Sequence, residues 1–235
     1  MATAAATERF TGFPEGGVDF FLELQAEQSR TWFKAHQADF ERLWKRPLEL
    51  FVYDLRTRLL DAYPALADVA PHFFRIQRDT RFARDKSPYK TNVAASMSLR
   101  PVEPGAEEMH GVPGMYFSFG LEADYVGVGS WHMSPEILQK YRHAVADDET
   151  GAPLQRAIDD LRKRGYGIEA MERTKRVPPP YAQDHPRGEL LKHKGLAVGI
   201  QVPEGLTQSL ELLDWAEAEM RRSKAVVDWL DRHLA

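Results

Sequence analysis

One stretch of the chain, residues 72–92, concentrates side chains that can bind an anion. It reads HFFRIQRDTRFARDKSPYKTN. Its cations are Arg75, Arg78, Arg81, Arg84, Lys86 and Lys90, and its carboxylates are Asp79 and Asp85. Six cations against two carboxylates leave a local charge of +4 in a chain whose formal net charge is −4. This excess predicts either an anion-binding surface or a dense network of salt bridges.

The anion-binding interpretation rests on a predicted helical turn. Ser87 suits an N-cap and Pro88 suits the first helical position, so Ser87–Lys90 is expected to open one turn. The free N–H groups of such a turn attract anions, and arginine adds a two-pronged donor suited to phosphate or carboxylate. The residues expected to bind the ligand are Arg75, Arg78, Arg81, Lys86, Ser87, Tyr89 and Lys90.

The salt-bridge interpretation makes a different prediction for the same arginines. If residues 73–78 form a strand, Arg78 shares a face with Phe74 and Ile76, while Arg75 points to the other face. Arg78 should then be the more buried of the two and should pair with a carboxylate, either Asp79, Asp85 or a Glu of the N-terminal helices. Its replacement by alanine would cost about 3 kcal/mol or more if it left a buried charge unpaired.

Four residues are the candidates for a catalytic role. The candidates are Asp79, Asp85, His132 and His185, and nothing in their spacing indicates a metal site. The chain lacks cysteine, which excludes thiolate nucleophiles, and it has no GxSxG or GxxxxGK[ST] motif. We therefore expect no metal and no cofactor, and the sequence names no reaction.

The periodicity of apolar residues predicts an α+β fold. Apolar residues alternate in about five stretches, which predicts antiparallel strands over 73–78, 93–99, 115–121, 124–130 and 196–202. A period of 3.6 predicts helices within 17–63, with a break at Pro47, and over 135–145, 152–164 and 206–234. The central sheet should be covered by the N- and C-terminal helices.

The non-apolar face of the predicted strands consists of small residues. They are Ser96, Ser98, Ser118, Gly120, Gly127, Gly129, Ala197 and Gly199. Glycine weakens a strand unless something approaches its backbone closely. The pattern therefore predicts either a tightly docked helix or the floor of a groove, edged by Arg75, Gln77, Tyr116 and Tyr125.

Composition is that of an ordinary globular protein. With 235 residues, 43% hydrophobic and 28% charged, the chain is expected to form a single domain over 1–235, with residues 1–8 disordered. No run of about 20 apolar residues or signal peptide is apparent, which predicts a cytoplasmic protein without a membrane. The oligomeric state is left open.

The string Arg78-Asp79-Thr80-Arg81-Phe82, followed by Asp85-Lys86-Ser87-Pro88-Tyr89-Lys90, resembles the family called domain of unknown function 2461. The resemblance extends over nearly the whole chain, including Trp32-Phe33, Gly127-Val128-Gly129 and His185-Pro186. It implies a single-domain α+β protein and assigns no activity.

The sequence is therefore compatible with three functions. The preferred hypothesis is binding of a phosphorylated or otherwise anionic small molecule at residues 75–90. The second is a nucleic-acid or protein interaction module that uses the same basic and aromatic patch, although a net charge of −4 disfavours extended contact with nucleic acid. The third is a purely structural salt-bridge motif.

Overall fold

The structure, a computed structural model, describes residues 8–81, 85–102 and 111–234. Its six-stranded antiparallel sheet has the order β1-β2-β3-β4-β6-β5. The strands are β1 (His72–Phe73), β2 (Asn92–Ser98), β3 (Gly114–Gly120), β4 (Tyr125–Ser130), β5 (Gly167–Glu169) and β6 (Leu196–Gln201). The α+β class and the antiparallel sheet are thus confirmed.

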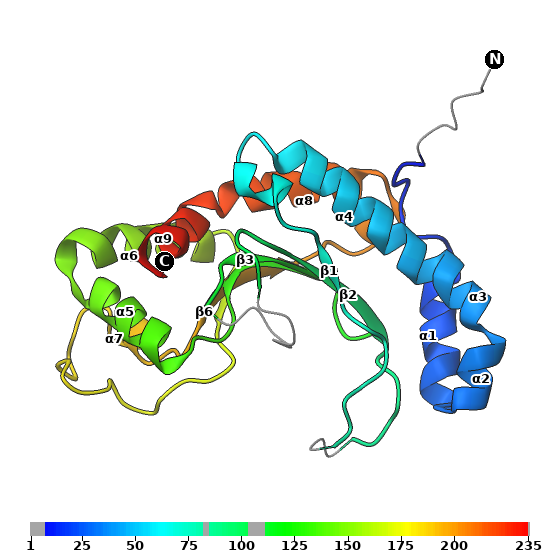
Figure 1. Cartoon of the computed structure of the whole chain (residues 1–235), viewed down its shortest axis with the longest axis horizontal. Coiled ribbons are helices and arrows are strands. Elements are labelled where there is room, and N and C mark those ends of the chain that lie inside the picture. The colour runs from blue at the N-terminus through cyan, green and yellow to red at the C-terminus, as the bar shows by residue number, and fades with distance from the viewer. Residues whose placement is uncertain (1–7, 82–84, 103–110, 235) are drawn as a thin grey trace.

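Helices flank this sheet on one side and at both ends (Figure 1). The N-terminal helical elements are α1 (Gly17–Ala26), α2 (Arg30–Ala35), α3 (Gln37–Phe40), the π-helical turn η1 (Glu41–Lys45), α4 (Arg46–Leu59) and the short 3-10 turn η2 (Pro64–Ala67). The later ones are α5 (Pro135–Ala146), α6 (Asp148–Arg162), α7 (Gly188–Leu191), η3 (Leu206–Gln208), α8 (Glu211–Arg222) and α9 (Lys224–Leu234). Figure 1 shows α4 and α8 along one side of the arched sheet, so helices from both ends of the chain cover it.

Several helix boundaries follow from local sequence. The Ser134 hydroxyl accepts a hydrogen bond from the Ile137 N–H, and Pro135 opens α5, as predicted. Pro47 lies in the first turn of α4, also as predicted. Asp147 caps α6 by accepting from the N–H groups of Glu149 and Thr150, both at 3.0 Å, so this helix begins four residues before the predicted start.

Strand alternation gives the sheet two chemically different faces. The first, called the Phe117 face, carries the apolar residues of the strands and forms the core. Phe51 of α4 contacts the rings of Phe117 and Phe119 edge-on, at 5.5 and 5.3 Å between centroids. The buried apolar residues form one cluster that includes α4, α8 and α9.

The opposite face, called the Tyr116 face, is marked by one row of paired residues across the sheet. The row runs His72, Ser96, Tyr116, Gly127, Gly199 and Gly167. A Cβ added to Gly199 would lie 2.0 Å from the Tyr125 hydroxyl oxygen, and one added to Gly127 would lie 2.9 Å from it. The glycines therefore make room for the Tyr125 ring, which takes the space that either a docked helix or an open groove would need at these two positions.

Two strand predictions need correction. The strand predicted over 73–78 is only two residues long as β1, because beyond Phe74 the chain leaves β2. The three-residue β5 was missed, because so short a strand has too few residues to show alternation.

The last helix is divided, not continuous over 206–234 as predicted. Between α8 and α9, the Ser223 hydroxyl donates to the Glu219 carbonyl at 3.0 Å. Such a bond competes with the helical pattern and bends the chain.

The N-terminal tip is described only in part. The predicted disorder of residues 1–7 lies outside the described residues. Glu8, the last residue of the predicted disordered tip, forms an ion pair with Arg46 at 2.7 Å. Within the described ranges, no helix combines the length and apolarity that a membrane crossing needs.

Candidate functional site

The basic segment extends β1 and β2 as two paired limbs, residues 74–81 and 85–91, here together called the basic hairpin. Its two limbs are joined by hydrogen bonds from the Arg78 N–H to the Pro88 carbonyl and from the Lys90 N–H to the Ile76 carbonyl, both 2.9 Å. Gln77 and Tyr89 face each other between these bonds. The predicted helical turn at Ser87–Lys90 is therefore wrong, because pairing with the opposite limb keeps this backbone extended.

The hairpin is anchored to the N-terminal helices through Tyr89. Its ring is 6% exposed and stacks on Phe33 of α2, with centroids 4.4 Å apart and planes 20° apart. The Gln28 side chain accepts from the Tyr89 N–H at 3.1 Å and donates to its carbonyl at 3.4 Å. Tyr89, predicted to contact a ligand, is thus a core residue that fixes the base of the hairpin.

Both carboxylates of the hairpin have partners within it. Asp79 accepts from the Arg81 guanidinium at 2.7 Å, and this bond, more than any other, lowers the pKa of Asp79 to about 2. Asp85 accepts hydrogen bonds from the hydroxyl and the N–H of Ser87, which lower its pKa. Each carboxylate is therefore engaged by residues close to it in the sequence.

Arg78 pairs with Asp85 at 3.2 Å, which confirms that it binds a carboxylate. Arg78 is the more buried of the two arginines, as predicted, but the ion pair is not sealed from solvent, since the Arg78 and Asp85 side chains are 30% and 54% exposed. The expected face is wrong, because Phe74 lies on the Tyr116 face whereas Ile76 belongs to the core. The alternation breaks where the chain leaves the sheet after Phe74.

Two cations of the hairpin lie beside Arg78 and have no ion-pair partner among the described residues. Arg75 is exposed, and Lys90 is half-buried. Burial, followed by the charges of Arg75 and Arg78, lowers the pKa of the Lys90 ammonium. We call Arg75, Arg78 and Lys90 the cation group. The remaining predicted lysine, Lys86, donates to the Thr80 carbonyl at 2.7 Å.

Aromatic rings on the Tyr116 face lie next to the cation group. The Lys90 ammonium is 5.8 Å from the centroid of the Phe74 ring. Phe74 in turn meets Tyr116 edge-on at 5.9 Å and His72 at 4.7 Å. Tyr116 is 36% exposed, so the charged end of the hairpin continues into an accessible aromatic surface.

Polar groups accompany these rings. The Asn92 amide donates to the Ser118 hydroxyl at 2.8 Å, and Ser118 also interacts with the Tyr116 hydroxyl. Burial is the main cause that raises the pKa of Tyr116 and of Tyr125. Both phenols are therefore neutral hydrogen-bonding groups near neutral pH.

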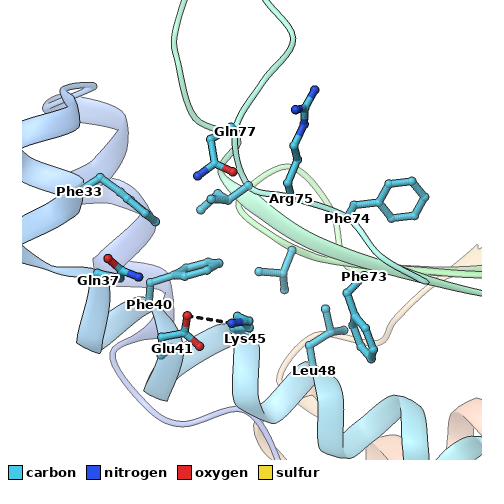
Figure 2. A pocket seen from close by; sticks show the side chains of 12 residues that line it. Phe33, Gln37, Phe40, Glu41, Lys45, Leu48, Phe73, Phe74, Arg75 and Gln77 are labelled. Carbon is cyan, nitrogen blue, oxygen red and sulfur yellow. Dashed lines mark hydrogen bonds and ion pairs between the residues drawn. The ribbon is translucent and has the colours of Figure 1, made fainter. Parts of the chain in front are cut away.

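A cavity of about 260 Å³ lies between the N-terminal helices and residues 73–77 (Figure 2). Its walls are mainly apolar and include Phe40, Leu48 and Ile76. Lys45 and Glu41 pair with each other at 2.9 Å in its wall, while the Arg75 guanidinium points away from it. Phe74 and Arg75 also line the cavity, which therefore adjoins the cation group but has a mainly apolar interior.

The four weak catalytic candidates contact different elements and do not form one site. Asp79 and Asp85 lie in the basic hairpin, and His132 follows β4, where its carbonyl accepts from the Gly111 N–H at 2.8 Å. His185 accepts from the Arg187 N–H at 3.0 Å and its other ring nitrogen lies 3.3 Å from the Ala146 carbonyl, a structural arrangement. In the described ranges, no three His, Asp or Glu side chains are grouped to hold a metal ion.

Sequence reasoning identified Tyr116 and Tyr125 but missed His72, Phe74 and Asn92 as neighbours of the cations. The contact between Phe74 and Lys90 is what could have indicated these neighbours. It depends on which residues pair across the hairpin, and the sequence does not show this pairing. Arg75 and Gln77, expected at the edges of a groove, lie beyond the end of β1.

The combination of a six-stranded antiparallel sheet, helices from both chain ends and a basic hairpin defines an α+β protein. A family model described as "Conserved hypothetical protein (DUF2461)" matches residues 17–229. The chain therefore belongs to this family, as its resemblance implied. No curated protein and no solved structure matches the chain.

Proposed function

We propose that the protein binds a small phosphorylated or carboxylated molecule at the cation group, Arg75, Arg78 and Lys90. The observation that carries the proposal is the position of Lys90. This half-buried ammonium lies close to two guanidinium groups and has no ion-pair partner among the described residues. A buried charge is costly unless it is paired, so an anionic ligand would relieve an existing electrostatic strain.

The internal carboxylates do not serve this purpose. Asp79 is held by Arg81, and Asp85 by Ser87 and Arg78. An incoming anion would therefore meet Lys90 and Arg75 without first displacing an ion pair. Lysine supplies a point charge and arginine a planar donor, a combination suited to phosphate or carboxylate.

Thermal unfolding in the presence of candidate anions tests the proposal. The panel consists of inorganic phosphate, sulfate, sugar phosphates, nucleotides and dicarboxylates. A ligand at 100 times its dissociation constant should add about 2.7 kcal/mol to the free energy of unfolding. Absence of stabilisation by every compound at millimolar concentration would contradict the proposal and favour a structural role for the hairpin.

Charge-neutralising variants locate the site. Lys90→Gln and Arg75→Gln should each reduce the stabilisation by the ligand, because each removes one cation of the group. Lys175→Gln and Arg156→Gln are matched controls, since both residues are exposed and lie outside the hairpin. Equal loss of binding in the controls would indicate a general charge effect in place of a site.

A further inference from the structure

The Tyr116 face offers more than an anion site needs. An anion requires only the cation group, yet the half-buried Phe74 ring lies directly beside it and the exposed Tyr116 ring lies next to Phe74. Phe74 is the link, because both the Lys90 ammonium and the Tyr116 ring lie within 6 Å of its ring centroid. A molecule with its anionic group at Lys90 would therefore extend over Phe74 and Tyr116.

The strand between Phe74 and Tyr116 adds no large side chain to this face. On β2, between Phe74 and Tyr116, the residues on this face are Ala94 and Ser96, which are small. Ser96 is 1% exposed and its hydroxyl makes no hydrogen bond within the described structure. An unsatisfied buried hydroxyl is uncommon and calls for a partner. It lies directly opposite Tyr116 and His72 in the strand register.

We propose that the ligand is a nucleotide, with its phosphate at the cation group and its base stacked on Tyr116. This inference rests on the proposed function and specifies its ligand class. Aromatic side chains on open sheets are suited to stacking with bases, and the neighbouring Ser118 and Asn92 supply polar groups for the edge of a base. The free nucleotide is favoured over a long strand because the cation group is small and the chain has a net charge of −4.

The phosphate and the base can be tested separately by titration calorimetry. The probes are adenosine monophosphate, uridine monophosphate, ribose phosphate and inorganic phosphate. We expect the nucleotides to bind about ten-fold more tightly than ribose phosphate, because stacking adds to the affinity. Tyr116→Ala should remove this difference and leave the affinity for ribose phosphate unchanged, whereas Tyr116→Phe should preserve it.

Tyr53→Ala is the control, because Tyr53 is similarly exposed but lies on α4, which packs on the Phe117 face. Circular dichroism establishes that each variant is folded. If Tyr116→Ala unfolds, Tyr116→Phe still provides a test, because stacking predicts that this variant keeps the tenfold preference for nucleotides over ribose phosphate. Equal affinity of wild type for nucleotides and ribose phosphate would overturn the nucleotide inference but leave the proposed anion site intact. Failure of all phosphate compounds to bind would overturn both.

A strand-binding module would give a third result. A short single-stranded oligonucleotide would then bind far more tightly than a mononucleotide, with an affinity that falls steeply as salt is raised. That outcome would overturn the inference of a free nucleotide. Comparable affinity of the oligonucleotide and the mononucleotide per nucleotide unit, with a weak salt dependence, would support a free nucleotide as the ligand.

Discussion

Lys90 differs from the other described lysines in combining partial burial, a lowered pKa and two neighbouring arginines. Surface lysines usually keep their ammonium groups in water, so their charge costs the folded protein little free energy. Here burial and like charge both disfavour the charged ammonium, and a bound anion would offset part of this cost. The environment of Lys90 therefore connects the electrostatics of the basic hairpin to the proposed function.

The first prediction concerns pH. A bound anion favours the charged form of Lys90, so affinity should fall as pH rises through the pKa of Lys90 in the free protein. Because that pKa is lowered, the fall should begin below the usual range for lysine. The measurement is a titration at increasing pH with a ligand whose own charge is constant above neutrality.

Lys90→Arg provides the comparison, because a guanidinium stays charged over this range. The variant should hold its affinity to higher pH than wild type. If the two proteins lose affinity at the same pH, another group controls binding and the assignment of Lys90 is refuted.

The second prediction concerns Arg78, whose replacement by alanine should be mild. Its ion pair with Asp85 is partly exposed, and such pairs contribute about 0–1 kcal/mol. Loss of the Arg78 charge also relieves its electrostatic repulsion of the Lys90 ammonium. We expect Arg78→Ala to lower the free energy of unfolding by about 1 kcal/mol or less in urea denaturation. A loss of about 3 kcal/mol would reinstate the buried-charge interpretation.

At the scale of elements, the basic hairpin depends on contacts distant in sequence. Tyr89 stacks on Phe33, and Gln28 holds both backbone groups of Tyr89. The third prediction is that Tyr89→Ala lowers stability by about 3–5 kcal/mol, as for other buried aromatic residues. Tyr53→Ala should cost far less, because this tyrosine is 47% exposed. Similar losses in both variants would argue against the anchor.

The glycines of the Tyr116 face give the fourth prediction. Gly199→Ala should destabilise the protein by about 1–3 kcal/mol, because its Cβ would meet the Tyr125 ring and the Val126 carbonyl. Gly167→Ala lies in the same row but would meet nothing closer than 3.5 Å, and should change stability little. Replacing Tyr125 by alanine should partly rescue Gly199→Ala in a double-mutant cycle. Additive effects would show that the ring is not the obstacle.

The sequence predicts those elements whose pattern is local. Strands β2, β3, β4 and β6 alternate over six or seven residues, and their predicted positions are correct to within one or two residues. The end of β1 was not predictable in this way, because it is determined by where the hairpin leaves β2. The helical turn predicted at Ser87 failed for the same reason, since the Lys90 N–H binds Ile76 across the hairpin.

The candidate site, like the fold, could be predicted only where the signal is local in the sequence. Charge counting located a basic segment that has six cations and two carboxylates. It could not distinguish Arg81, which binds Asp79, from Arg75, which has no ion-pair partner in the described structure. Nor could it place Phe74 and Tyr116 together, because Phe74 follows β1, Tyr116 lies on β3, and β2 runs between these two strands.

At the scale of the whole molecule, the sheet joins two groups of helices that lie beyond its ends. Figure 1 shows α1–α3 at one end and α5–α7 at the other, with α4 and α8 between them along one side. The buried residues of both groups belong to one hydrophobic cluster. The anchor of the basic hairpin and the C-terminal helices therefore share a continuous core through the Phe117 face.

This continuity gives the last prediction, that the chain unfolds as one cooperative unit. Hydrogen exchange measured at rising urea concentration should show the slowest amides of α4, β3 and α9 opening in a common step, because no break divides their core. Far-UV circular dichroism and tryptophan fluorescence should give coincident transitions, since Trp44 and Trp229 are buried in the N- and C-terminal helical regions. Two separated transitions, with α9 opening before α4, would contradict a single domain and would assign the basic hairpin to a smaller folding unit.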